Sequence, residues 1–167
     1  MTTTATELMK KLKFIEQDIA SIHQNDEKDA YVPIIESTNE EGQKTLVPAY
    51  DVFYDFVGNR EKIRELYEEE LEIKRILNEF NQRTLVDGYH ITIGEGLVRL
   101  AQLKEEVKVL TTITRRGKYV QDSYREGLRK ATYDDREVKD ELRKAQRELS
   151  ALQVAIDRTN LTVKIDY

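Results

Sequence analysis

Four stretches of the chain repeat hydrophobic residues at alternating intervals of three and four, with polar residues between them. The most regular stretch carries Val138, Leu142, Ala145, Leu149, Leu152 and Ile156, at spacings of four, three, four, three and four. A stripe on a 3.5-residue repeat is typical of an α-helix that packs along its length against another helix. The pattern therefore predicts helices over about 4–24, 50–81, 94–116 and 134–157.

These helices predict a mainly α fold, a bundle of four long antiparallel amphipathic helices with coiled-coil-like packing. We expect residues 56–80 to pair with residues 97–110, and the first and last helices to complete the bundle. A length of 167 residues suits one domain over 1–167. Helices this long in a short chain leave apolar surface that further copies could cover. The regular fourth helix is the expected oligomer seam, through Val138, Leu142, Leu149, Leu152 and Ile156.

Two polar residues, Asn59 and Glu70, fall in the register of the apolar stripe of the second helix. A polar residue at a seam position can set the register of helix pairing at a cost in stability. Alternatively, the stripe drifts around the helix, by about 20° per heptad, and these side chains reach solvent. We favour the drift.

The helical pattern breaks over about 25–50, where both prolines of the chain occur. Two short apolar runs, 31–35 and 45–48, flank a polar turn that ends at Gly42, which predicts a β-hairpin insertion. A smaller hairpin is expected around 86–91, because Asp87-Gly88 is a strong turn dipeptide. Residues 119–133 read as an irregular connection.

Composition excludes several classes of protein. The chain has no cysteine, which rules out disulfides, thiolate catalysis and cysteine-bound zinc. A charged fraction of 35% and only two prolines favour long exposed helices. The net charge of −5 does not suggest nucleic-acid binding by the whole surface. No window resembles a signal peptide or a membrane span, so we expect a cytoplasmic protein without a membrane span.

No arrangement of residues predicts catalysis, a metal or another cofactor. The two histidines, His23 and His90, stand alone in the sequence. The acidic run over 65–72 places several glutamates on one helix face, but the Glu-x-x-His motifs of di-iron bundles are missing. Gly94-Glu95-Gly96 is too short for a phosphate loop, and no nucleophile elbow occurs. We therefore expect a protein that is not an enzyme.

The strongest candidate for ligand binding is a basic segment over 115–130. Its cations are Arg115, Arg116, Lys118, Arg125, Arg129 and Lys130, and Tyr119, Tyr124 and Tyr133 lie among them. Cations with interleaved aromatic residues can hold a polyanion such as nucleic acid, through phosphate contacts and base stacking. Acidic residues in the same stretch oppose this reading, and the segment could instead pair with the acidic face of the second helix.

Two short motifs resemble those of the septicolysin-like bacterial proteins. The stretch Ile156-Asp157-Arg158-Thr159-Asn160-Leu161-Thr162 is similar to their terminal motif after a long helix. Gln82-Arg83-Thr84, Asp87-Gly88 and the stretch 91–97 are similar to their interior motif. The likeness covers about residue 71 to the end, departs over 25–51, and lacks a tryptophan near the C-terminus. It implies a helical, oligomer-forming protein of uncharacterised function, and the family name suggests a lytic factor.

Taken together, these features predict a non-enzymatic structural or interaction protein that forms a homo-oligomer through its long helices. The first alternative is a polyanion-binding module that uses the basic segment 115–130. The second is the lytic role that the family name suggests.

Overall fold

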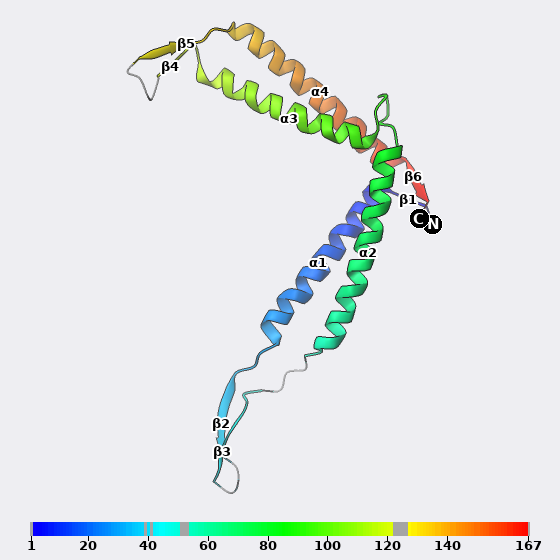
Figure 1. Cartoon of the computed structure of the whole chain (residues 1–167), viewed down its shortest axis with the longest axis vertical. Helices are drawn as coiled ribbons and strands as arrows, with labels where there is room; N and C mark the ends of the chain where they lie inside the picture. Colours follow the sequence, from blue (N-terminus) through cyan, green and yellow to red (C-terminus); the bar gives the residue numbers. More distant parts are fainter. Residues whose placement is uncertain (1, 39, 41, 51–53, 122–126, 167) are drawn as a thin grey trace. The chain divides into compact units, whose positions relative to one another are not determined.

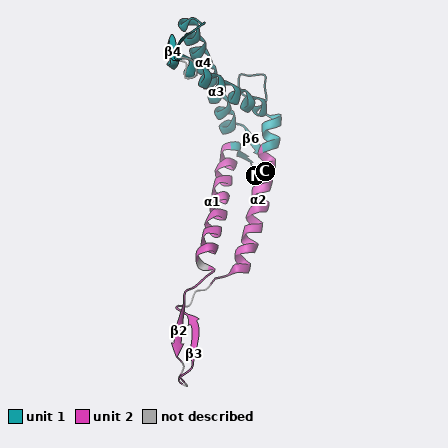
Figure 2. Ribbon diagram, turned by 60° about the vertical axis from the view of Figure 1, so that its left-hand side comes forward, with its two compact units in different colours: residues 1–5, 78–167 teal, residues 6–77 magenta. Residues whose placement is uncertain are grey.

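The computed structural model describes residues 2–38, 40, 42–50, 54–121 and 127–166. Its helices are α1 (Ala5–Asp29), α2 (Phe56–Arg83), α3 (Ile93–Arg116) and α4 (Asp135–Thr162). Its strands are β1 (Thr2–Thr4), β2 (Ile34–Thr38), β3 (Lys44–Pro48), β4 (Tyr119–Gln121), β5 (Leu128–Lys130) and β6 (Lys164–Asp166). The mainly helical prediction is confirmed. The chain forms two compact units, residues 6–77 and residues 1–5 with 78–167 (Figure 2).

In the unit of residues 6–77, α1 and α2 lie side by side and antiparallel, and the β2–β3 hairpin lies beyond their ends (Figure 1). The buried stripes predicted for these helices form the core, with Leu8, Ile15 and Ile19 from α1 and Ile63 and Ile73 from α2. The ion pairs Lys11–Glu69 at 2.6 Å and Lys74–Glu16 at 3.9 Å flank that core. The unit is thus a layer two helices wide.

In the other unit, α3 and α4 pack side by side, with the β4–β5 hairpin at one end (Figure 1). Leu100 and Leu103 of α3 and Leu152 and Ile156 of α4 are almost fully buried. The helices approach closely at Gly96, where an added Cβ would lie 3.0 Å from Ile156 Cδ1. The small side chain is therefore what permits tight packing at this point.

Hydrogen bonds between Thr92 and Glu95 determine where α3 begins. Thr92 caps α3, since its Oγ1 accepts from Glu95 N at 3.2 Å while the Glu95 carboxylate accepts from Thr92 N at 2.7 Å. These bonds lower the pKa of the Glu95 carboxyl, mainly because the Thr92 backbone N–H donates to its charged form and also because the Thr92 hydroxyl does so.

After α4, the strand β6 pairs with β1, with Thr3 opposite Ile165. The sequence pattern did not predict this pairing.

The predicted pairing of residues 56–80 with residues 97–110 is wrong, because α3 packs against α4 instead. The physical reason lies in the connections. Each helix pair is joined through a β-hairpin, β2–β3 or β4–β5, which turns the chain back on itself. The prediction that the domain is single, over 1–167, stays a prediction.

The hairpin predicted within 25–50 is confirmed, with Glu36 opposite Leu46 in the antiparallel register. The one predicted around 86–91 is a tight turn closed by a single bridge, Leu85 with Thr92, rather than a pair of strands. Gly88 takes a φ of 75° there, as the turn requires. The stretch 119–133, predicted to be irregular, contains the β4–β5 hairpin, so that prediction was wrong.

Candidate interaction surfaces

The expected oligomer seam on α4 lies at the contact with α3. Leu152 and Ile156 are each 1% exposed, and Val138, Leu142 and Leu149 are half-buried. Within the chain, α3 therefore covers the C-terminal half of the stripe most completely. A role for these residues between copies stays a prediction.

The opposite face of α4 carries a shallow apolar depression of about 480 Å³, lined by Arg147, Ser150, Ala151, Val154, Ala155 and Arg158. Its floor consists of small side chains, and Val154 remains 54% exposed. Two arginines border it. This face is thus apolar in the middle and positively charged at its margins.

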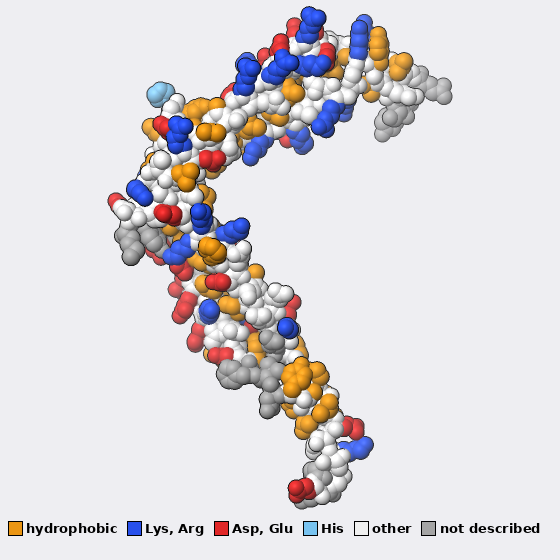
Figure 3. Space-filling model, turned by 180° about the vertical axis from the view of Figure 1, so that it is seen from behind, with side chains coloured by type: hydrophobic (Ala, Val, Ile, Leu, Met, Phe, Trp, Pro, Cys, Tyr) orange, Lys and Arg blue, Asp and Glu red, His pale blue; other side chains and the backbone are white. Residues whose placement is uncertain are grey.

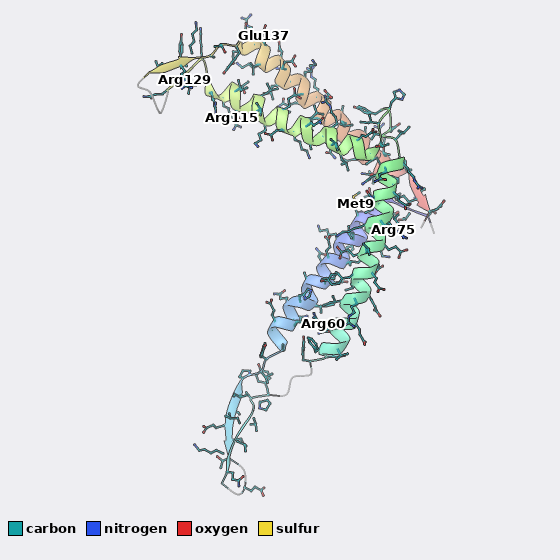
Figure 4. All side chains as sticks on the ribbon, viewed as in Figure 1. Met9, Arg60, Arg75, Arg115, Arg129 and Glu137 are labelled. Carbon is teal, nitrogen blue, oxygen red and sulfur yellow. The ribbon has the colours of Figure 1, made fainter. Side chains whose placement is uncertain are left out.

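A cleft of about 740 Å³ lies beside the described part of the basic segment, where α3, the β4–β5 hairpin and the start of α4 meet. Lys118, Lys130 and Lys139 line the cleft, and Arg115 and Arg116 lie exposed at the adjoining end of α3. Figure 4 shows Arg115 and Arg129 at this end of the helix pair. Arg125 and Tyr124 lie outside the described residues.

Acidic groups oppose an anion in the same cleft. Asp134 and Asp135 line it, and Lys139 pairs with Asp135. Asp134 Oδ1 accepts from Arg136 N at 2.8 Å, so the first turn of α4 is capped by the chain itself. The Tyr133 hydroxyl donates to Ile113 O at 3.3 Å, which holds that ring against α3. The arrangement can attract phosphate, but more weakly than a wholly basic cleft.

A polar cluster that the sequence analysis missed lies between α1 and α2, at the end nearest the β2–β3 hairpin. The Asp26 carboxylate, 15% exposed, pairs with Arg60 and accepts hydrogen bonds from the Tyr54 hydroxyl and, at 3.1 Å, from Asn59 Nδ2. Arg60, labelled in Figure 4, stacks over the Phe56 ring at 5.4 Å. The cluster holds the two helices together through charge and hydrogen bonds.

In the sequence, the polar residue Asn59 in the apolar stripe of the second helix was the feature that pointed to this cluster. Our interpretation that Asn59 and Glu70 drift to solvent was wrong, because Asn59 is half-buried against Asp26 and the Glu70 side chain is only 18% exposed. Glu70 forms an ion pair with Lys74, one turn further along α2. At Asn59, a polar residue in the seam register therefore indicated a contact between helices.

Two further candidate residues, Glu69 and His23, have neighbours in their own unit. Glu69 of the acidic run pairs with Lys11 of α1. His23 Nε2 lies 3.4 Å from the Tyr67 hydroxyl, and its Nδ1 lies 4.0 Å from Asp26. Within the described ranges, no three His, Asp or Glu side chains are grouped to hold a metal ion. Over the same ranges, no helix has the length and apolar character needed to cross a membrane.

The β2–β3 hairpin exposes apolar side chains to an unusual degree. Ile34 is 62% exposed, Ile35 50% and Leu46 65%, and Tyr31 and Tyr50 beside the strands are 82% and 56% exposed. Figure 3 shows hydrophobic side chains where the hairpin leaves the helices, with charged groups nearer its tip. Neighbouring exposed apolar side chains are a common feature of interaction surfaces, so the hairpin is a candidate for one.

Comparison with known proteins supports the fold. The chain is similar to the crystal structure of a functionally unknown conserved protein from Corynebacterium diphtheriae, with a TM-score of 0.68 and 20% identity, over 99% of this chain and 100% of that one. At this identity the likeness supports the fold alone. No family model and no curated protein matches the chain.

Proposed function

We propose that this chain is a non-enzymatic structural or interaction protein that associates with copies of itself. The observation that carries the proposal is its accessible surface of 13116 Å² for a mass of 19.6 kDa. A compact protein of that mass exposes about 8,600 Å², and two separate compact domains of half the mass about 10,300 Å² together. Layers two helices wide have two open faces, and contact with a further copy would cover one.

The α1–α2 layer offers an apolar face for this contact. Tyr67, Leu71 and Lys74 follow at spacings of four and three, so they share one face of α2. Lys74 pairs with Glu16 of α1, so the face that carries Tyr67 and Leu71 lies on the same side of the two-helix layer as Glu16. Leu71 is 71% exposed and Tyr67 48%. Two such layers packed together would form a four-helix antiparallel bundle with two helices from each copy, whereas the sequence analysis predicted such a bundle within one chain.

Sedimentation equilibrium over 1–100 µM tests the proposal, with the expected result of a molar mass above that of one chain. Replacing Leu71 by Ser should weaken association about tenfold or more, since burying a leucine side chain is worth about 1.5–3 kcal/mol. Phe14→Ser is the matched control. Phe14 is 65% exposed and lies one turn from Lys11. Because Lys11 pairs with Glu69, on the side of α2 away from Leu71, Phe14 lies on the opposite side of the layer from Leu71. A monomer throughout this range would overturn the proposal.

A second candidate function, polyanion binding, is favoured by the cleft that Lys118, Lys130 and Lys139 line. Nucleic acid or another polyphosphate would contact these lysines together with Arg115 and Arg116. A salt-dependent mobility shift with single-stranded DNA, lost in Arg115→Gln/Arg116→Gln, would support it. Equal shifts for the variant and the original chain would count against it. The lytic role that the family resemblance implies is an expectation that liposome leakage would test.

A further inference from the structure

The β2–β3 hairpin is a two-stranded sheet with little support from the rest of the chain. In each strand, β2 (Ile34–Thr38) and β3 (Lys44–Pro48), four residues are exposed and the fourth along the strand is half-buried. An isolated pair of strands is marginally stable in water, and three or more strands with a covered apolar face are needed for independent stability. The hairpin therefore calls for a partner strand.

The register shows which backbone groups are available to such a strand. Ala49 N donates to Pro33 O at 2.8 Å, so this pair is hydrogen-bonded. Since bonded and non-bonded pairs alternate in an antiparallel ladder, Ile35–Val47 is bonded as well, whereas Ile34–Pro48 and Glu36–Leu46 are not. The N–H and C=O groups of Ile34 and Glu36 consequently point outward, along the free edge of β2.

The two edges of the hairpin differ. On β3, the outward position of Pro48 carries no N–H, which blocks continuous pairing along that edge. On β2, Ile34, Glu36 and Thr38 all keep both a donor and an acceptor. The charge of Glu36, which would otherwise discourage pairing, is matched by Lys44 at 3.1 Å within the hairpin. The β2 edge is therefore open and the β3 edge is closed.

We infer that the β2 edge pairs with the β2 edge of a second copy, giving an antiparallel four-stranded sheet in the order β3-β2-β2-β3. This inference rests on the proposed self-association and names a second contact for it, separate from the one around Leu71, because the two chains leave an antiparallel sheet in opposite directions. In the register that sets Ile34 opposite Glu36 of the second copy, the two Glu36 side chains are diagonal rather than directly opposite, and about four new backbone hydrogen bonds form. Ile35 then lies opposite its own counterpart, on the two-fold axis.

A second copy fits this edge better than an extended segment of another protein. An edge that offers both donors and acceptors is complementary to itself in the antiparallel sense. Because Pro48 closes the other edge, the pairing through β2 itself ends at two copies. Apolar Ile34 and Ile35 would lie at the centre of the new sheet, on opposite faces, each beside a side chain of the second copy.

Disulfide cross-linking tests the contact directly, because the chain has no cysteine of its own. In the inferred register the two Ile35 residues form a non-hydrogen-bonded pair, whose Cα atoms lie about 4.5 Å apart and permit a disulfide. Ile35→Cys should therefore form a covalent dimer on mild oxidation. Val47→Cys, which replaces the residue opposite Ile35 within the hairpin, is the matched control and should remain a monomer on a non-reducing gel.

A second test of the β2–β2 contact uses proline substitutions. Glu36→Pro removes an outward N–H of β2 without removing a bond of the hairpin, and should abolish cross-linking of Ile35→Cys. Leu46→Pro does the same to the β3 edge and should leave the cross-linking unchanged. If Ile35→Cys and Val47→Cys cross-link to equal extents, or Ile35→Cys not at all while the chain still associates in solution, the inference is overturned and the proposed self-association stands. A chain that is monomeric in solution and forms no cross-link overturns both.

Discussion

The polar cluster around Asp26 leads to a quantitative prediction for Asp26→Ala. The carboxylate is 15% exposed and serves three partners, the Tyr54 hydroxyl, Asn59 Nδ2 at 3.1 Å and Arg60. Removing it leaves Arg60, 27% exposed, without its counter-charge. The helices α1 and α2 would then lose the ion pair and the hydrogen bonds that join them through Asp26.

The magnitude follows from the burial of the two charged groups. A hydrogen bond to a charged group contributes about 1.5–3 kcal/mol, and breaking a fully buried ion pair costs about 3–5 kcal/mol. Arg60 keeps about a quarter of its surface in water and stacks on Phe56, so the lower end applies. We expect Asp26→Ala to reduce the free energy of unfolding by about 2–3 kcal/mol.

Urea unfolding followed by far-UV circular dichroism measures this change, and hydrogen exchange of the α1 amides localises it. Asp140→Ala is the control, because Asp140 and its partner Arg143 are 73% and 69% exposed, and its effect should stay below about 0.5 kcal/mol. Adding Arg60→Met to Asp26→Ala should restore part of the loss, since no unpaired charge then remains. Equal effects of Asp26→Ala and Asp140→Ala would refute the structural role of the cluster.

Two further predictions concern the unit that contains α3 and α4. Thr159, 1% exposed, accepts from Asp87 N at 3.0 Å, so Thr159→Val should cost about 1–3 kcal/mol in urea unfolding, whereas Thr162→Val on the exposed side of α4 should cost much less. The pKa of Glu95 is lowered by the Thr92 N–H and hydroxyl, so its stabilising effect is full above its ordinary pKa of 4.5 and is lost as the pH falls through the lowered value. The difference in urea midpoint between the original chain and Glu95→Gln should accordingly be larger at pH 7 than at pH 3, and a constant difference would contradict this.

The spacing of apolar residues predicted the helices because periodicity is a local property of the sequence. All four were found, with ends displaced by up to six residues, as for α2, which begins at Phe56 rather than near residue 50. Their pairing could not be predicted in the same way. A stripe on a 3.5-residue repeat can pack against any similar stripe. That α4 packs against α3 depends on the close approach at Gly96 and on the β4–β5 hairpin that connects the two helices.

The candidate surfaces were predictable to the extent that their residues are neighbours in sequence. Arg115, Arg116 and Lys118 were identified because they lie together in the chain, but the cleft also needs Lys139, which only the β4–β5 pairing brings near. The Asp26 cluster joins residues 28 and more positions apart, and Asn59 alone pointed to it. The open edge of β2 depends on which pairs of the hairpin are bonded, a fact that the register provides and composition does not.

The structure separates the residues that hold each helix pair together from those that remain for partners. Asp26 with Arg60, and Thr159 with the backbone of Asp87, lie at inner contacts, where a polar group is held by residues far away in the sequence. The apolar side chains of Leu71 and Ile35 lie outside these contacts. Inner substitutions should therefore lower the free energy of unfolding at any protein concentration, whereas outer ones should change the molar mass and the concentration dependence of unfolding. Outer substitutions that destabilise equally at 1 and 100 µM would show that these apolar residues support the fold of one chain rather than a contact between copies.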